Sequence, residues 1–142
     1  MSQTTASDAL PSRLLYTMLR VSDLEKSIDF YHRALGMEEL RRENFTEGRF
    51  TLVFMGYPKQ PDNAMLELTY NWDQHDYQQG NAYGHIALAV TDIYAACQRL
   101  EAMGVKVVRP AGPMTFAADE TGEKELIAFI EDPDGYRVEL IG

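Results

Sequence analysis

Cysteine is nearly absent from this sequence, since Cys97 is the only one in 142 residues. A single cysteine cannot form a disulfide within the chain, so stability has to come from a core rather than from cross-links. A chain of this length buries well over half of its unfolded surface as one domain. We therefore predict a single domain without disulfides, in a reducing compartment such as the cytoplasm.

Basic residues and long apolar runs are also scarce. The chain has 13 Lys and Arg against 22 Asp and Glu, a net charge of -9. It lacks a clustered basic stretch that would displace counterions from phosphates, so a nucleic-acid partner is not expected. No apolar run reaches membrane-spanning length, and a membrane partner is not expected either. The polar start MSQTTASDALPS lacks the regions of a signal peptide and predicts a flexible tail over residues 1–13.

What the sequence does contain is one pattern that occurs twice. VSD at 21–23 precedes an amphipathic stretch, and VTD at 90–92 precedes another, 69 residues later. Each stretch ends at a glycine, Gly36 or Gly104, as helices often do. Apolar or aromatic positions at helical spacing match in pairs: Leu24 with Ile93, Ile28 with Cys97, and Tyr31 with Leu100. Two equivalent helices are predicted.

Segments typical of strands surround both helices. One strand precedes each helix, at 16–21 and 85–90, and three follow it: 37–42, 50–55 and 64–70 in the first half, 105–109, 126–131 and 136–141 in the second. We therefore expect an α+β fold of two tandem βαβββ modules, about 14–72 and 83–142, in one domain that spans 14–142. Each module alone would expose one sheet face, so the two are expected to pack around a shared concavity.

Three local signals add detail to this prediction. Ser22 with Glu25 three residues later predicts a capping box on the first helix only. DPDG at 132–135 predicts a tight turn with proline at its second position. The long connection 110–125 is interpreted either as a lid over a site or as a disordered segment.

The repeat also brings four side chains to equivalent positions. Tyr16 and His85 lie on the first strand of each half, and Glu67 and Glu139 lie on the last. Two glutamates and a histidine form a mixed oxygen and nitrogen set that suits Zn, Ni or Co. A neutral phenol is a poor ligand, which makes Tyr16 the odd member. Taken singly, each glutamate is also typical of a solvated strand face, and His85 of a hydrogen-bonded core histidine.

Four blocks of the sequence resemble one known family in the same order. The segments TMLRVSDLEKSIDFYHRALGM, ELTYNW, YGHIALAV and AFIEDPDGYRVELI are similar to the lactoylglutathione lyases, or glyoxalase I family, of the vicinal-oxygen-chelate superfamily. The resemblance covers about residues 14–141. It implies a homodimer with sites between the chains, each holding one divalent ion (Ni, Co or Zn). Matched residue by residue, it implies Glu67, His85 and Glu139 as ligands, with Tyr16 in the first-ligand position.

The reaction that this resemblance implies begins with the hemithioacetal of methylglyoxal and glutathione. The family isomerises this adduct to S-lactoylglutathione and so detoxifies methylglyoxal. The metal polarises the carbonyl and stabilises an enediolate, while a carboxylate moves a proton between adjacent carbons. By resemblance Glu139 is the main base, and Glu67 is its counterpart on the opposite face.

The glutathione part of the substrate has candidate contacts of its own. Arg20 lies four residues beyond Tyr16, and Asn71 four beyond Glu67, which places each roughly 13 Å further along its strand. The resemblance implies Arg20, Asn71 and Arg109 as glutathione contacts. A surface ion pair for Arg20 and a strand-ending turn for Asn71 are the structural alternatives.

Tyr16 is the one departure from the family pattern. It leaves three outcomes open: three protein ligands completed by water, a metal-bound phenolate, or a fold that no longer binds metal. A working lyase is the first interpretation, and a non-catalytic protein that binds glutathione conjugates or other small molecules is the second. A metal-dependent dioxygenase ranks last, because its usual triad needs two histidines and the constellation has one.

Overall fold

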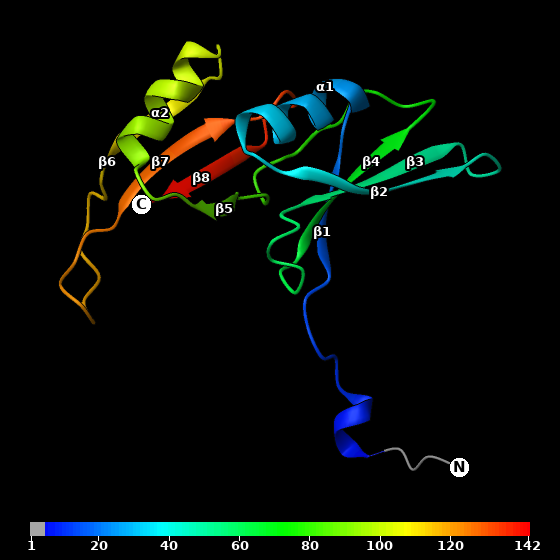
Figure 1. The fold of residues 1–142 in the computed structure, drawn as a ribbon, viewed down its shortest axis with the longest axis horizontal. Coiled ribbons are helices and arrows are strands. Elements are labelled where there is room, and N and C mark those ends of the chain that lie inside the picture. Colours follow the sequence, from blue (N-terminus) through cyan, green and yellow to red (C-terminus); the bar gives the residue numbers. More distant parts are fainter. Residues whose placement is uncertain (1–4) are drawn as a thin grey trace.

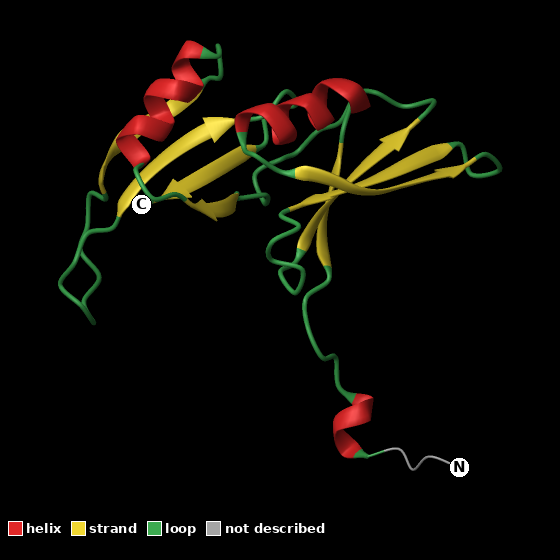
Figure 2. Ribbon diagram, viewed as in Figure 1, coloured by secondary structure: helices red, strands yellow, loops and turns green. Residues whose placement is uncertain are grey.

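The structure is a computed structural model that describes residues 5–142; residues 1–4, the start of the predicted tail, lie outside the described part. Within residues 5–142 eight strands form two four-stranded sheets, and one helix covers each sheet on the same side (Figure 1 and Figure 2). The opposite face of each sheet carries no helix formed by residues 5–142. The predicted α+β fold of two βαβββ modules is confirmed.

The two sheets have the same strand order. The first runs β1 (Tyr16–Arg20), β4 (Met65–Asn71), β3 (Phe50–Gly56) and β2 (Glu38–Phe45), and the second runs β5 (Ile86–Ala89), β8 (Arg137–Ile141), β7 (Leu126–Glu131) and β6 (Val107–Pro113). In each sheet the first strand pairs in parallel with the last, and the other pairs are antiparallel. β1 and β5 are therefore edge strands.

The helices differ in length and regularity. α1 (Leu24–Asp29) continues as a π-helical turn, η2 (Phe30–Ala34), whereas α2 (Ile93–Ala102) is a regular helix. A short 3₁₀ helix, η1 (Ala6–Ala9), precedes the first sheet. No helix in residues 5–142 is long and apolar enough to span a membrane.

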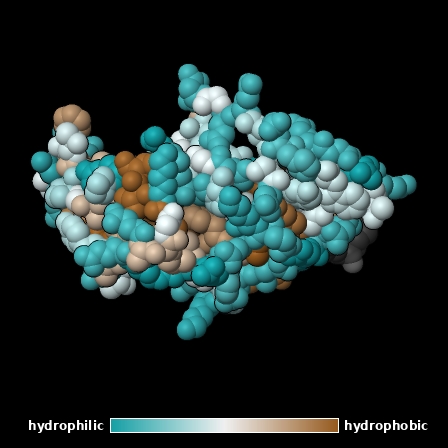
Figure 3. Space-filling model, turned by 90° about the horizontal axis from the view of Figure 1, so that it is seen from above, coloured by the Kyte–Doolittle hydropathy of each residue, from teal (hydrophilic) through white to brown (hydrophobic). Residues whose placement is uncertain are grey.

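One core lies between the helices and the sheets and contains residues of both modules. Leu19 and Leu68 come from the first sheet, Ile130 and Leu140 from the second, and each is at most 3% exposed. Burying such side chains stabilises the fold by about 1.5–3 kcal/mol each. Seen from above, the surface is largely hydrophilic, with apolar residues gathered near its middle (Figure 3). The two modules are thus held together by a shared apolar core.

The helix starts correct one prediction. Asp23 and Asp92 cap α1 and α2, because their carboxylates accept hydrogen bonds from Lys26 N at 3.2 Å and Ala95 N at 3.0 Å. The capping box predicted at Ser22 is wrong, since the Ser22 hydroxyl donates to Asp134 of the other module at 2.5 Å. The two helices therefore begin in the same way.

The turn at 132–135 joins the two modules. It forms as predicted, with Gly135 N donating to Asp132 O at 3.0 Å and Gly135 at φ +83°, a conformation that favours glycine. From the first module, Ser22 N and Oγ donate to Asp134, and the buried Tyr31 hydroxyl donates to Asp132 at 2.7 Å. Burial raises the pKa of Asp132, and the hydrogen bond from Tyr31 opposes this rise. This buried network fixes the first helix onto the second sheet.

The connection predicted as a lid or as disorder forms a hairpin arm. Its first residues belong to β6, and Met114 N donates to Glu125 O at 2.9 Å across the arm. The arm projects away from both sheets (Figure 1), and the Phe116 side chain near its tip is exposed. In this structure the arm covers neither sheet.

Candidate metal and substrate site

Two pairs of side chains occupy equivalent places on the faces of the sheets that carry no helix. In the parallel pair β1–β4, Tyr16 lies beside Met65, two residues before Glu67. In β5–β8 the register places His85, which directly precedes β5, two residues before Glu139 in the same way. Residues two apart on a strand share a face, so each ring residue accompanies one glutamate. We call these pairs the first and the second half-site.

The second half-site is closely assembled. His85 Nε2 lies 3.1 Å from Glu139 Oε1, and the Glu139 side chain is largely buried. The His85 ring also meets Phe129 edge to face, with ring centroids 5.0 Å apart. Phe129 is the neighbour of Glu139 across β7 and β8. An imidazole and a carboxylate thus lie together against one phenylalanine.

The first half-site repeats this arrangement with a phenol in place of the imidazole. The Tyr16 ring meets Phe54 edge to face, with centroids 5.2 Å apart, and Phe54 is the neighbour of Glu67 across β3 and β4. The Arg41 guanidinium lies over the same Phe54 ring, 4.0 Å from its centroid. Tyr16 therefore occupies the place in its module that His85 occupies in the other.

Sequence reasoning missed the two phenylalanines, although a signal for them was present. Phe54 and Phe129 are the third apolar residues of LVF and IAF in the equivalent strands β3 and β7. The repeat that pairs the first and last strands of the modules also pairs β3 with β7, and so Phe54 with Phe129. In each half-site the ring of Tyr16 or His85 packs against one of these phenylalanines.

Glu67 is buried, which excludes the solvated strand face as its explanation. It is 6% exposed, and within residues 5–142 it takes part in none of the ion pairs or side-chain hydrogen bonds. Burial raises the pKa of Glu67, while the charge of Arg41 opposes the rise. A largely buried carboxylate is less well solvated than an exposed one, and a bound cation offsets that cost. The donor set of the half-sites therefore fits a divalent metal ion.

A complete ligand set needs both half-sites. Among the residues from 5 to 142, no three His, Cys, Asp or Glu side chains of a single chain lie close enough together to hold a metal ion. Each half-site supplies one glutamate and one ring, and the two half-sites belong to different sheets. Glu67, His85 and Glu139 could come together only where a first half-site faces a second one.

Two of the predicted glutathione contacts lie close to one another. Arg20, at the end of β1, borders a cavity of about 540 Å³ that is otherwise lined by Gln74, Asp76, Tyr77 and Gln78. Asn71 Nδ2 donates to the Tyr77 hydroxyl at 3.0 Å. Arg20 and Asn71 thus share Tyr77 as a neighbour at the same end of the first sheet.

Arg109, the third predicted contact, lies apart from these two. Its guanidinium donates to four backbone carbonyl oxygens at the base of the hairpin arm, those of Pro110, Gly112, Pro113 and Ile127, at 2.6–3.1 Å. In this structure its donors therefore hold the arm in place.

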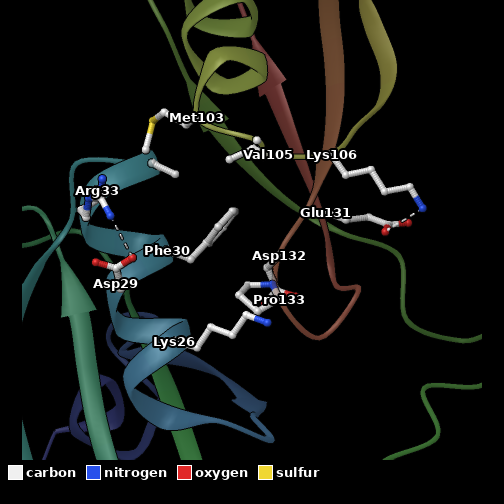
Figure 4. A pocket seen from close by; sticks show the side chains of 12 residues that line it. Lys26, Asp29, Phe30, Arg33, Met103, Val105, Lys106, Glu131, Asp132 and Pro133 are labelled. Carbon is white, nitrogen blue, oxygen red and sulfur yellow. Dashed lines mark hydrogen bonds and ion pairs between the residues drawn. The ribbon is translucent and has the colours of Figure 1, made fainter.

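A further cavity lies on the helix side, away from both half-sites. It measures about 400 Å³ between α1, η2 and the second module, and contains none of the predicted site residues (Figure 4). Four of its charged groups form two ion pairs, Arg33 with Asp29 at 3.5 Å and Lys106 with Glu131 at 3.3 Å. The aromatic ring of Phe30 points into it (Figure 4).

Comparison with known proteins places the whole fold in one group. Residues 13–140 match the family model of the Glyoxalase/Bleomycin resistance protein/Dioxygenase superfamily. A lactoylglutathione lyase of Neisseria meningitidis serogroup A is 56% identical over 129 residues, which cover 91% of this chain and 89% of that protein.

Two solved structures share the fold. Glyoxalase I from Zea mays superposes with a TM-score of 0.81 at 36% identity, covering 91% of this chain and 44% of the longer maize chain. The trypanothione-dependent glyoxalase I of Leishmania major superposes with a TM-score of 0.76 at 39% identity, covering 93% of this chain and 87% of that one.

Proposed function

Because the chain belongs to the Glyoxalase/Bleomycin resistance protein/Dioxygenase superfamily, we propose that it is a metal-dependent lactoylglutathione lyase. Its reaction would isomerise the hemithioacetal of methylglyoxal and glutathione to S-lactoylglutathione. The observation that carries this proposal is the pair of matching half-sites, in which each module sets a buried or largely buried glutamate beside a ring residue. Relatives that are 50–56% identical to this chain and are named as lactoylglutathione lyases support the proposal.

The proposed metal ligands are Glu67, His85 and Glu139. Since they lie on two half-sites that do not meet within the chain, the proposed enzyme is a homodimer in which the first half-site of one protomer faces the second half-site of its partner. The free edges of β1 and β5 support this arrangement, because unpaired strand edges are natural places for a second chain. A dimer of this kind has two sites, each holding one ion of Ni, Co or Zn.

The proposed chemistry is a proton transfer between neighbouring carbons. A divalent ion held there would supply electrophilic polarisation of the substrate oxygens. Glu139 takes the proton from the carbon that bears sulfur and returns it to the adjacent carbon, so the reaction consumes no electrons and no co-reactant. Glu67 faces Glu139 across the site. His85, whose Nε2 lies 3.1 Å from Glu139 Oε1, would bind the same ion beside that carboxylate.

Tyr16 stands in the fourth position, and we propose that it is a neighbour of the metal rather than a ligand. Its ring packs edge-on against Phe54. Its hydroxyl forms no side-chain hydrogen bond with any of residues 5–142. Three protein ligands with the remaining positions open to water and substrate form a viable catalytic site.

The proposed thiol carrier is glutathione, bound through Arg20 and Asn71 beside Tyr77, with Arg109 released from the arm to meet a carboxylate. The names of the bacterial relatives support glutathione, whereas the Leishmania relative is described as trypanothione-dependent. The buried, unpaired Cys97 supports a cytoplasmic setting for a glutathione-using enzyme.

Turnover of the glutathione hemithioacetal tests the function directly. The metal-free protein is supplied with Ni or Zn, and formation of the thioester is followed by its absorbance. Metal-dependent turnover is expected. Turnover of the trypanothione adduct alone would mean that the thiol carrier is trypanothione and not glutathione. Micromolar binding of glutathione conjugates without turnover or metal uptake would instead favour the non-catalytic binding protein.

A further inference from the structure

Tyr136 lies where the second module touches the end of β1. It is 8% exposed, and its hydroxyl donates to the main-chain carbonyl oxygen of Arg20 at 2.8 Å. Its own backbone is fixed by the turn, since Tyr136 N donates to the Asp132 carboxylate at 2.8 Å and Tyr136 O accepts from Asp132 N at 2.9 Å. A rigid turn in one module thus holds the phenol against a strand end in the other.

The Tyr136 ring also contacts the segment that leads to the second half-site. The Tyr83 ring meets it edge to face, with centroids 5.2 Å apart, and the Tyr83 hydroxyl donates to Arg137 O at 3.2 Å. Tyr83 lies two residues before His85. One side chain therefore connects the strand end that carries Arg20 with the segment that carries His85.

We propose that Tyr136 is a positioning residue that aims Arg20 at the substrate. The proposal rests on the proposed function, in which Arg20 binds the glutathione moiety. Arg20 is at the exposed end of β1, where neighbouring strands constrain it on one side only, because β1 is an edge strand. The hydrogen bond from Tyr136 supplies the constraint on the other side.

This role makes a distinct kinetic prediction. Arg20 contacts a part of the substrate that does not change during the reaction, so its loss of position weakens ground-state and transition-state binding alike. Tyr136→Phe, which removes only the hydroxyl, is expected to raise KM for the hemithioacetal about threefold to tenfold and to leave kcat within about twofold.

Tyr57→Phe is the matched control. The Tyr57 hydroxyl also donates to a main-chain carbonyl, that of Leu35, at 2.7 Å, but this contact is remote from Arg20. The control is expected to leave KM and kcat unchanged. Should Tyr136→Phe fail to fold, Ser22→Ala replaces it with the same expectation, because the Ser22 hydroxyl ties the same junction to Asp134.

A double-mutant cycle with Arg20→Ala decides the matter. Binding of S-methylglutathione to the metal-free protein is measured by calorimetry, alongside KM and kcat. Tyr136→Phe is expected to weaken binding in the natural chain and to have no further effect when Arg20 is already alanine. If Tyr136→Phe weakens binding equally in the natural and the Arg20→Ala chains, or leaves KM unchanged, the positioning role is overturned. Turnover by the natural chain still upholds the proposed function in that case. If the natural chain neither binds the probe nor turns over, both are overturned.

Discussion

Replacing Tyr16 by histidine tests whether this chain lacks a metal ligand. Tyr16 and His85 occupy matching places, each edge-on to a phenylalanine that neighbours a glutamate. The imidazole of Tyr16→His would therefore take the place in the first half-site that His85 holds in the second, where the His85 imidazole lies 3.1 Å from Glu139. Tyr16→His is expected to add a fourth ligand and to tighten metal binding.

The structure sets the scale of this effect. Tyr16 is 41% exposed, so the variant loses little more than the edge contact with Phe54, about 0.5–1.5 kcal/mol in the metal-free state. A tenfold gain in affinity corresponds to about 1.4 kcal/mol. At saturating metal this gain appears as added stability of the folded protein. The rise in Tm that metal causes should therefore be about 4 °C larger in the variant than in the natural chain.

Two measurements check the result. A competition titration against a chelator gives the affinity for Ni and Zn, and thermal unfolding with and without metal gives the shift in Tm. Tyr16→Phe is the control, because it keeps the ring and removes the hydroxyl, and it is expected to retain the natural affinity. Unchanged affinity in Tyr16→His would mean that position 16 lies outside the ligand set, whereas a large loss in Tyr16→Phe would mean that the phenol itself binds metal.

Two further changes test the packing between modules and the charge of the buried glutamate. Tyr31→Phe removes the hydrogen bond to the Asp132 carboxylate and is expected to lower the free energy of unfolding by about 1.5–3 kcal/mol. Calorimetry should show one transition, about 5–10 °C lower, and two separate transitions would contradict a shared core. Because the raised pKa of Glu67 makes its ionisation costly as pH rises above the ordinary carboxyl value, Glu67→Gln is expected to raise Tm of the metal-free protein near pH 7. The difference in Tm between the variant and the natural chain should disappear below about pH 4, where Glu67 is protonated in the folded and the unfolded protein alike. A difference that stays constant with pH would argue against ionisation of Glu67 as its cause.

The sequence was sufficient for the fold because the repeat supplied two readings of the same pattern. The repeat placed Tyr16 against His85 at an offset of 69 and Glu67 against Glu139 at an offset of 72, and the strand registers set both pairs in the same relation. The helix cap was missed for a physical reason. Ser22 has a better partner in Asp134, more than a hundred residues away, and a local pattern carries no information about that contact.

The site was only partly accessible from the sequence. Strand alternation predicts which face a side chain takes, but not how deeply it is buried, so Glu67 was as typical of a solvated face as of a ligand. In the structure Glu67 is 6% exposed and lies beside the buried Phe54 of the neighbouring strand. Arg109 shows the same limit, because its four carbonyl partners depend on the shape of the arm.

The most direct test of the account mixes two inactive variants. Glu67→Gln disables the first half-site and Glu139→Gln the second, so each alone is expected to lose turnover. If active sites form between chains, unfolding and refolding the two together restores one intact site in every mixed dimer, which gives about a quarter of the natural activity. Thioester formation at that level with added Ni or Zn is the predicted result. Two variants that stay inactive after mixing, although each is folded and dimeric, would contradict it.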